Sequence, residues 1–269
     1  MSTPTRADVD AVQWYHSIEL APGVTTPGWF DTRAVAPTFP WPDLTGRRCL
    51  DVGTFEGFWA LEMERRGAGE VVAVDVRDAT AWDWPIGSAA ATVAVLEERK
   101  RNSDGFAVAK SALGSSVERR ELSVYDLEPA DVGTFDMVYV GSLLLHLRDP
   151  VRALERVRSV LKPDGHLMSV DAIDLELTLR HPRRAVCSFD GQGRPWWWKV
   201  NLSAHRRLVE SAGFTVVDGP RRFSMPRGAG QPTVRPPLRQ LRTPAGREAL
   251  ATHLRGDPHA VLLATVRPD

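Results

Sequence analysis

The stretch LDVGTFEGFW, residues 50–59, reads as the end of a buried strand, a sharp turn and the start of a helix. The apolar run that contains its beginning, RCLDVG (48–53), is continuous rather than alternating, which is typical of a parallel strand covered on both faces. Gly53 and Gly57 suit the turn, because glycine adopts backbone conformations that other residues avoid. Phe55 stands between them, where a further glycine is expected. The stretch predicts a strand–loop–helix unit whose strand belongs to a parallel sheet.

Strand and helix signals alternate along the rest of the chain. Apolar runs predict further strands, and the last two follow each other without an obvious helix, which predicts an antiparallel closing strand. We therefore expect an α/β fold with a Rossmann-like, seven-stranded, mostly parallel sheet and helices on both faces. The predicted strands are 48–53, 70–76, 117–127, 135–142, 166–173, 214–219 and 259–266. The predicted helices are 57–69, 104–116, 149–161 and 203–213. Gly67 is expected to end the first of them. Asp149 and Pro150 should begin the third, and KPDGH (162–166) should end it, whereas Ser203 should cap the fourth and Gly213 end it.

Residues 1–45 are rich in tryptophan and proline and show little periodicity. They predict an N-terminal aromatic arm with one short helix near residues 9–18. Residues 46–269 are expected to form the main domain, with insertions at 172–200 and 219–246.

The composition is that of an ordinary soluble globular protein, with 269 residues of which 43% are hydrophobic and 25% charged. Two cysteines provide neither a disulfide framework nor a metal-binding spacing. The first residues lack the apolar run of a signal peptide, and no segment reaches the ~18 to 20 apolar residues of a membrane span. We expect a cytoplasmic protein with no metal and no membrane partner.

The formal net charge is zero but unevenly distributed. Residues 1–175 contain 18 Lys and Arg against 27 Asp and Glu, whereas residues 176–269 contain 16 against 7. A basic C-terminal part permits contact with an anionic substrate or a nucleic acid, although the two parts can also neutralise each other. The overall neutrality disfavours strong phosphate binding.

The loop at 53–57 fits neither of two common phosphate-binding patterns. A dinucleotide loop needs a third glycine at position 58, which is Phe58, and a P-loop needs a Gly-Lys-Ser/Thr sequence that is absent. The remaining pattern is D-x-G-x-x-x-G, formed by Asp51, Gly53 and Gly57. Ligands of such sheets bind where strand order reverses, so we expect a pocket between Gly53 and Gly141, with the Phe55 side chain turned away from it.

Two aspartates follow later strands. Asp75 lies 22 residues after Gly53, where a ribose-binding carboxylate is expected, because one carboxylate accepts two hydroxyl hydrogen bonds. Asp126 is a candidate for an adenine amino group, with Tyr125 and Leu127 beside the ring. A turn-forming role is the alternative for each aspartate. The predicted cofactor contacts are Asp51, Gly53, Thr54, Phe55, Gly57, Asp75, Val76, Tyr125, Asp126, Leu127 and Gly141.

The stretch LDVGTFEG, Asp75, YDL (125–127) and VGSLLLHLRDP (140–150) together resemble the class I S-adenosylmethionine (SAM) methyltransferases. The resemblance covers roughly residues 44–214. It implies SAM as the cofactor, with Gly53 and Gly57 at the methionine part, Asp75 at the ribose and Asp126 at the adenine.

A narrower set of stretches is similar to the group that includes the wobble-uridine tRNA carboxymethyltransferases: WYHSIEL (14–20), GWFD (28–31), DLTGRRCLDVG (43–53) and WWWKVNLSAHRRLVESAGF (196–214). Those enzymes use carboxy-SAM and read its carboxylate with a lysine, a tyrosine and an arginine. Here Leu145 and His259 match the tyrosine and the arginine, and the lysine has no counterpart near Ala21. A buried carboxylate without cationic partners is costly, so we expect ordinary SAM and regard tRNA as a less favoured acceptor.

Methyl transfer from a sulfonium is an in-line displacement for which the protein mainly positions the reactants. A general base is needed only when the nucleophile must lose a proton. His146, five residues beyond Gly141, is the first candidate, and a hydrogen bond to the helix start at Asp149 is its alternative role. Further candidates are Asp171, then His16 and His181.

The segment RPWWWKV (194–200) carries three consecutive tryptophans, which cannot all face one core. At least one is predicted to face the pocket, as part of an aromatic lid over a planar or apolar acceptor; anchoring of the 172–200 insertion is the alternative. The predicted substrate contacts are Trp14, His16, Trp29, Trp196, Trp197, Trp198 and Lys199.

These features favour a SAM-dependent methyltransferase that acts on an oxygen or nitrogen of a small molecule. A tRNA-modifying methyltransferase and a regulatory protein with a SAM-binding fold but no activity are the alternatives. The sequence leaves the identity of the acceptor and the oligomeric state open.

Overall fold

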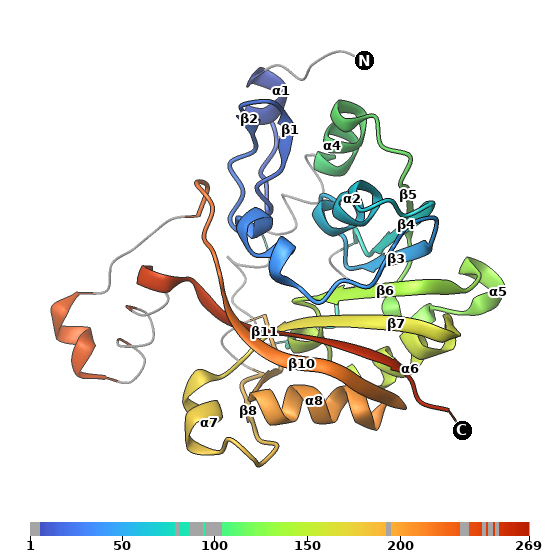
Figure 1. Ribbon diagram of the computed structural model, residues 1–269. Coiled ribbons are helices and arrows are strands. Elements are labelled where there is room, and N and C mark those ends of the chain that lie inside the picture. The colour runs from blue at the N-terminus through green and yellow to red at the C-terminus, as the bar shows by residue number, and fades with distance from the viewer. Residues whose placement is uncertain are drawn as a thin grey trace.

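The computed structural model describes residues 6–78, 81–86, 94, 104–191, 195–231, 237–243, 246, 250 and 253–268. A seven-stranded sheet crosses the molecule in the order β10-β11-β7-β6-β3-β4-β5 (Figure 1). Its strands are β3 (Arg48–Val52), β4 (Glu70–Asp75), β5 (Glu118–Glu121), β6 (Phe135–Gly141), β7 (Leu161–Ala172), β10 (Phe214–Met225) and β11 (Asp257–Val266). The neighbours from β5 to β7 pair in parallel, and β11 is antiparallel to both β7 and β10. The predicted fold class, including the antiparallel last strand, is confirmed.

The central strands are buried on both faces, as their continuous apolar runs predict. Cys49 and Met137 belong to one core cluster with helices α2 (Phe58–Arg65) and α4 (Gly105–Leu113). Leu50 and Val138, which alternate with them, belong to a second cluster with α6 (Pro150–Ser159) and α8 (Leu202–Ser211). The sheet is therefore the middle layer between two layers of helices.

The N-terminal arm contributes to the first core cluster. It comprises α1 (Arg6–Asp10), β1 (Glu19–Ala21), β2 (Val24–Thr25), η1 (Thr32–Ala34) and η2 (Ala36–Thr38). Val12, Trp14, Ile18 and Leu20 are buried together with side chains of α2 and α4. The predicted helix near 9–18 is wrong in extent: the helix ends at Asp10, because the backbone after it pairs with a second arm segment, where Ser17 N–H donates to the Phe30 carbonyl at 2.8 Å.

The N-terminal cap of α6 is the predicted residue, whereas that of α8 is a different one. Asp149 caps α6 by accepting a hydrogen bond from the Arg152 N–H at 3.0 Å, and Pro150 is the first helical residue, as predicted. The predicted cap Ser203 lies instead inside α8. The cap is Asn201, which accepts from the Ala204 N–H at 2.9 Å and is fully buried. Its amide group also donates to two carbonyls of the preceding loop, so tertiary contacts select it.

Three strands differ from their predicted ranges by more than two residues, namely β5, β7 and β10. β7 already begins at Leu161, so KPDGH lies in the strand rather than at a helix end. β10 continues to Met225 through irregular pairing after Val216, so the beginning of the 219–246 stretch belongs to the sheet. Residues 232–236 and 244–245 of that stretch lie outside the described residues. The predicted strand 117–127 is reduced to β5 and is followed by a short 3-10 turn, η4 (Val124–Asp126).

The remaining elements connect the strands. They are α5 (Pro129–Val132), η5 (Leu144–His146), α7 (Leu175–Arg180), the two-stranded pair β8 (Cys187–Phe189) and β9 (Trp198–Val200), and η6 (Leu238–Arg242). Within the described part of the chain, every helix is too short or too polar to cross a bilayer.

Candidate functional site

The loop between β3 and α2 has three residues in the left-handed backbone region: Gly53 (φ 79°), Phe55 (φ 52°) and Gly57 (φ 88°). Gly57 precedes the first residue of α2 and is its N-cap. Phe55 adopts a conformation that glycine usually takes, and its ring stacks on Tyr15 of the arm with centroids 4.7 Å apart and planes 20° apart. Phe55 thus keeps a backbone conformation typical of glycine while its ring packs on the arm.

Asp51, in β3, binds both the loop and the first turn of α2 through hydrogen bonds. Its side chain is 1% exposed, and Oδ2 accepts hydrogen bonds from the Thr54 hydroxyl at 2.6 Å and the Ala60 N–H at 3.1 Å. Burial raises the pKa of the Asp51 carboxyl to about 6, although the hydrogen bond from Thr54 opposes this shift. The structure thus places Asp51 and Thr54 as a tether between β3, the loop and the first turn of α2.

Asp75 lies at the end of β4, directly beside the loop. Its Oδ2 accepts the Phe55 N–H at 2.8 Å and its Oδ1 accepts the Val76 N–H at 2.7 Å. The backbone N–H groups of Gly53 and Thr54 both donate to the Val74 carbonyl, at 2.9 and 3.2 Å. The structure therefore brings the glycine loop and the predicted ribose-binding carboxylate together, on neighbouring strands.

Tyr125 belongs to a polar network that the sequence did not indicate. Its hydroxyl donates to Asp83 Oδ2 at 2.8 Å and accepts from the Asp149 N–H at 3.0 Å. Asp83 also accepts the Arg148 N–H at 2.6 Å, so it joins the segment after β4 to the start of α6. Burial raises the pKa of the Tyr125 hydroxyl, which keeps the hydroxyl protonated as a donor. Asp126 beside it is exposed.

Leu127 does not lie where a contact with the adenine ring was predicted. Its side chain is completely buried in the second core cluster, so it supports the turn at 124–126 from within the core. The part of the site around Tyr125 and Asp126 is instead bordered by the segment that carries Asp83.

The consecutive tryptophans pack against η5 and the segment after β4. Trp197 donates through its backbone N–H to the Leu145 carbonyl at 2.9 Å and through its indole to the Asp83 carbonyl at 2.5 Å. The Trp198 indole donates to the Leu147 carbonyl at 3.2 Å. All three side chains, Trp196–Trp198, are only partly buried, and the neighbouring Lys199 is as well.

Trp82 and Trp84, which no sequence pattern indicated, flank Asp83, the residue whose carbonyl accepts the Trp197 indole. We refer to Trp82, Trp84 and Trp197 as the aromatic wall. The rings of Trp82 and Trp84 lie 4.7 Å apart, and Trp84 stacks on His146 at 6.0 Å. Trp14 is not part of it: its side chain is 2% exposed in the first core cluster, and its indole donates to the Val9 carbonyl at 2.8 Å. Trp14 is therefore a core residue rather than part of the predicted lid. Trp29 lies beside Tyr15 at 6.3 Å, in the arm.

The two leading candidates for a general base are connected through η5. Asp171 at the end of β7 is 2% exposed and accepts the Ala172 N–H at 2.8 Å and the Leu145 N–H at 3.2 Å. His146 is the last residue of the same turn, and its Nδ1 contacts the Pro195 carbonyl. Asp171 thus supports the turn that carries His146. The weaker candidates lie elsewhere: His16 is buried in the arm, and His181 is exposed after α7.

Asp171 also gives a prediction for stability. Burial raises the pKa of its carboxyl to about 7, so the folded state binds a proton that the unfolded state has already lost above its ordinary pKa. The stability that this proton provides is present at low pH and is lost as the pH rises toward and through 7. We compare the free energies of unfolding of the wild type and of Asp171→Asn. Their difference, wild type minus variant, should fall by about 2 kcal/mol from pH 5 to pH 8. Urea denaturation at both pH values measures it, with exposed Asp164→Asn in β7 as the control; a constant difference would contradict the prediction.

Ser142 and His259 form a pair at the ends of β6 and β11 that no sequence spacing indicated. His259 Nδ1 lies 3.0 Å from the Asp257 carbonyl, which can only accept, so Nδ1 carries the hydrogen. Nε2 is then the acceptor for the Ser142 hydroxyl at 3.3 Å. Burial lowers the pKa of His259 to about 4, so the ring is neutral near pH 7.

Gly141 has a packing role beneath this pair. A Cβ at this position would lie 2.4 Å from Cε1 of Tyr139, whose ring stacks on Trp59 at 4.5 Å. The Tyr139 hydroxyl is completely buried and has no hydrogen-bond partner among the described residues. Gly141 thus leaves room for the Tyr139 ring at the end of β6.

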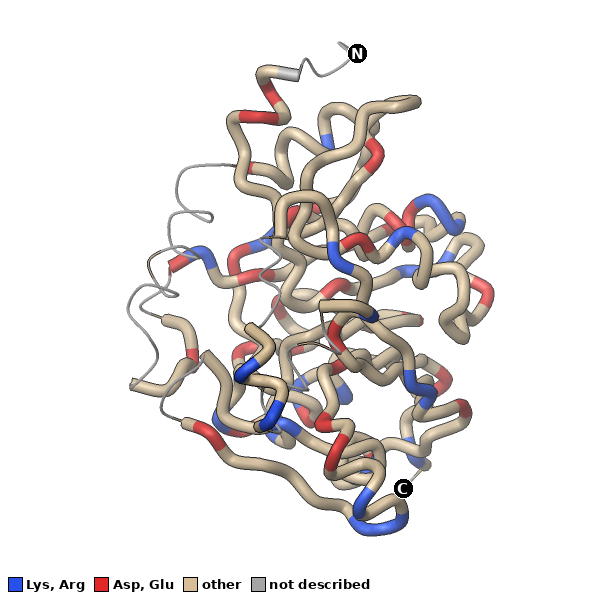
Figure 2. The backbone as a smooth tube through the Cα atoms, turned by 90° about the vertical axis from the view of Figure 1, so that its left-hand side faces the viewer, with Lys and Arg blue, Asp and Glu red and all other residues tan. Residues whose placement is uncertain are grey.

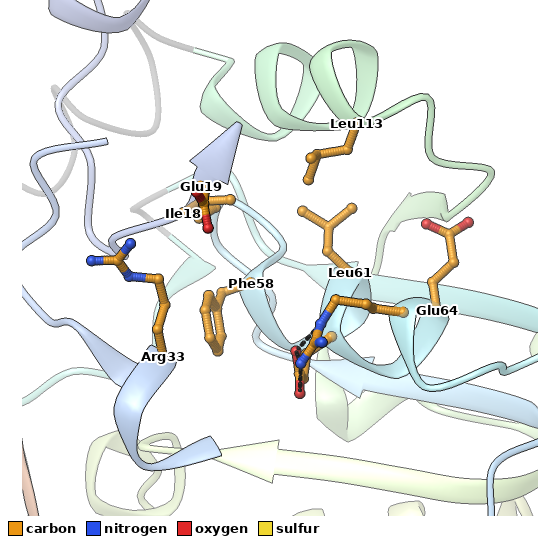
Figure 3. A pocket seen from close by; sticks show the side chains of 9 residues that line it. Ile18, Glu19, Arg33, Phe58, Leu61, Glu64 and Leu113 are labelled. Carbon is orange, nitrogen blue, oxygen red and sulfur yellow. Dashed lines mark hydrogen bonds and ion pairs between the residues drawn. The ribbon is translucent and has the colours of Figure 1, made fainter. Parts of the chain in front are cut away.

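A cavity of about 530 Å³ lies between the arm, α2 and α4 (Figure 3). Apolar side chains (Ile18, Phe58, Leu61, Leu113) and charged ones (Glu19, Arg33, Glu62, Glu64, Arg65) line it. None of the predicted site residues is among them, so this cavity is separate from the ends of β3, β4 and β6. The described residues contain no group of three His, Cys, Asp or Glu side chains able to hold a metal ion.

Comparison with known proteins places this fold. The family model described as a methyltransferase domain matches residues 30–218. The ubiquinone biosynthesis O-methyltransferase of Acinetobacter baumannii is 27% identical over 139 residues, which are 52% of this chain and 46% of that protein. The enzyme of the same name from Neisseria meningitidis is 28% identical over 181 residues, 65% of this chain and 67% of that protein. The chain thus matches about half the length of the Acinetobacter relative.

Solved structures share the fold at lower identity. A Burkholderia thailandensis 1,6-didemethyltoxoflavin-N1-methyltransferase with bound S-adenosylhomocysteine (SAH) has a TM-score of 0.52 and 17% identity, over 83% of this chain and 72% of that one. The N-terminal domain of EvdMO1 with SAH has a TM-score of 0.53 and 15% identity, over 97% and 95%. The family match covers more than half of the 269 residues, and the chain therefore belongs to the methyltransferase domain family.

Proposed function

We propose that the protein is a SAM-dependent methyltransferase that transfers a methyl group to an oxygen or nitrogen atom of a small-molecule acceptor. One observation carries the proposal: the Asp75 carboxylate lies 2.8 Å from the Phe55 N–H, within a loop bent by Gly53 and Gly57. A carboxylate and a bare backbone bend thus occupy the ends of adjacent strands, next to the point where strand order reverses between β3 and β6.

The described residues fit the cofactor. A Cβ on Gly53 would lie 3.5 Å from the Leu143 side chain, so Gly53 faces the loop after β6 at van der Waals distance. Gly53 and Gly57 would hold the methionine part there, Asp75 the ribose hydroxyls, and the turn at Tyr125–Asp126 the adenine. When bound, SAM supplies an activated methyl group on a sulfonium, and the chain positions it.

Ordinary SAM is favoured over carboxy-SAM by the surroundings of His259. At the position where the resemblance has an arginine, this ring is buried and neutral, and it is already engaged with Ser142 and the Asp257 carbonyl. A neutral imidazole does not balance the charge of an additional buried carboxylate.

A small-molecule acceptor is supported by the relatives, which are named for ubiquinone biosynthesis and O-methylation. The partly buried aromatic wall of Trp82, Trp84 and Trp197 suits a planar or apolar acceptor. For a nucleophile that must lose a proton, His146 is the proposed base and Asp171 positions its turn. Acidic and basic residues are interspersed along the backbone in Figure 2, which gives the tRNA alternative no support from a continuous basic band in that view.

Two measurements test this function. Calorimetric titration should show one site for SAH and SAM and binding at least ~10-fold weaker for carboxy-SAM, as expected for an unpaired charge. Label from methyl-tritiated SAM should then enter a mixture of phenols, catechols and amines rather than unfractionated tRNA. Label in tRNA would favour the RNA-modifying alternative, binding without transfer to either would favour the regulatory alternative, and absence of SAH binding would contradict the proposal altogether.

A further inference from the structure

Glu56, which precedes Gly57 in the glycine loop, is an unusual residue because its carboxyl group is buried. Its side chain is 8% exposed, although carboxylates are rarely buried unless they are paired. Oε1 accepts the Tyr15 N–H at 2.9 Å, and Oε2 lies 3.3 Å from His16 Nδ1. Both partners belong to the N-terminal arm, 40 or more positions earlier in the chain.

Two aromatic residues close to Glu56, Phe55 in the loop and Phe58 at the start of α2, contact the same two arm residues. Phe55 stacks on Tyr15, and Phe58 stacks on His16 with centroids 5.7 Å apart. The Tyr15 carbonyl in turn accepts the Phe30 N–H at 2.9 Å, which fixes the second segment of the arm. The loop and the start of α2 are thus bound to the arm by the polar contacts of Glu56 and by the aromatic stacks of Phe55 and Phe58.

From the arm, these contacts lead directly to the predicted cofactor residue. Phe55, whose ring stacks on Tyr15, donates its N–H to the Asp75 carboxylate at 2.8 Å. Phe55 also has a positive φ of 52°, which costs free energy in a residue other than glycine and persists only when the surroundings hold it. Displacement of Tyr15 would release the ring of Phe55 and, with it, the N–H that orients Asp75.

We propose that Glu56, with Tyr15 and His16, positions the glycine loop for the cofactor, so that arm docking and cofactor binding strengthen each other. The inference rests on the proposed SAM-binding function. Coupling of this kind is reciprocal: if the docked arm raises the affinity for SAH, SAH must stabilise the docked arm by the same factor. Glu56, Tyr15 and His16 act through Phe55 and Asp75 and are positioning residues.

The first variants change Glu56 itself. Glu56→Ala removes both contacts to the arm, whereas Glu56→Gln keeps an oxygen for the Tyr15 N–H and removes the charge beside His16. Glu62→Ala is the matched control. The Glu62 side chain is similarly buried, at 7% exposed, and is paired with Arg65 and Arg66 at 2.8 Å, but it lies on α2 away from the loop. Tyr15→Leu removes the stack on Phe55 and serves as a second variant if Glu56→Ala does not fold.

SAH is the probe, used with the full chain at a temperature at which circular dichroism shows each variant to be folded. Calorimetry should give an SAH affinity about 10-fold lower for Glu56→Ala and for Tyr15→Leu, an intermediate value for Glu56→Gln, and less than a twofold change for Glu62→Ala. Hydrogen exchange measured by mass spectrometry should slow in peptides covering residues 12–30 when SAH binds to the wild type, and much less in Glu56→Ala.

The outcomes separate the coupling from the proposed function. Wild-type affinity in folded Glu56→Ala and Tyr15→Leu, or arm exchange unaffected by SAH in the wild type, would overturn the coupling while SAH binding itself stands. An equal loss of affinity in Glu62→Ala would also overturn it, since the effect would then follow general stability. A wild-type protein that does not bind SAH removes the proposed function and this inference together.

Discussion

Replacing Asp75 with alanine is expected to weaken SAH binding by about 3 kcal/mol, or roughly 150-fold, because two kinds of hydrogen bond are lost together. The carboxylate would no longer accept bonds from the ribose hydroxyls, and hydrogen bonds to a charged group contribute ~1.5 to 3 kcal/mol. The Phe55 N–H would also lose its acceptor at 2.8 Å, which loosens the loop at the other end of the cofactor.

Asp75→Asn separates these two contributions, because an amide oxygen can still accept the Phe55 N–H but carries no charge. Its affinity should lie between those of the wild type and Asp75→Ala in the same calorimetric titration. Glu155→Ala controls for the change in net charge, because it removes an exposed carboxylate that lies on α6. Wild-type affinity in Asp75→Ala would contradict the assignment of this residue to the ribose.

Gly57→Ala is expected to lower the free energy of unfolding by about 3 kcal/mol, from backbone strain and overpacking. At φ 88° the new Cβ costs ~1 to 2 kcal/mol in the left-handed region. The same Cβ would lie 2.8 Å from the ring of Phe106 in α4, which adds ~1 to 3 kcal/mol of overpacking.

Gly46→Ala provides the matched control for this variant. Gly46 has a similar φ of 68°, but nothing lies within 4 Å of an added Cβ, so only the backbone strain applies. Urea denaturation of both variants should show the larger loss for Gly57→Ala, and adding Phe106→Leu to Gly57→Ala should recover part of the difference. Equal losses at the two glycines would show that the packing of α4 against the loop is less close than the structure has it.

Local sequence patterns sufficed for the parts of the site that one strand–loop–helix unit builds. The continuous apolar run before Gly53 and the helical run after Gly57 specify β3 and α2, and an acid after the next strand specifies the place of Asp75. These residues lie close together in the sequence, and parallel pairing of β3 with β4 brings their ends to one edge.

Features that depend on distant partners could not be read in this way. Ser142 and His259 are 117 positions apart, and the Trp197 indole reaches Asp83 across 114 positions. Asn201 and Ser203 are both good caps by residue type, and only the loop that Asn201 binds decides between them. Glu56 is buried by contacts with Tyr15 and His16, which lie 40 or more positions earlier, so its role was not visible in the local sequence.

The packing of the N-terminal arm also could not be predicted from its local sequence. Its tryptophans and prolines indicated an irregular segment, and an irregular segment with aromatic residues is compatible with a lid. The burial of Trp14, Ile18 and Leu20 in one cluster with α2 instead makes this part of the arm a component of the core. The same packing places Tyr15 and His16 against the glycine loop.

A crystal structure of the chain with bound SAH tests the central claim most directly. We expect both ribose hydroxyls to lie within hydrogen-bonding distance of the Asp75 carboxylate and the homocysteine part to lie along the backbone from Gly53 to Gly57. SAH bound instead in the cavity between the arm, α2 and α4, with the Asp75 carboxylate uncontacted, would contradict it.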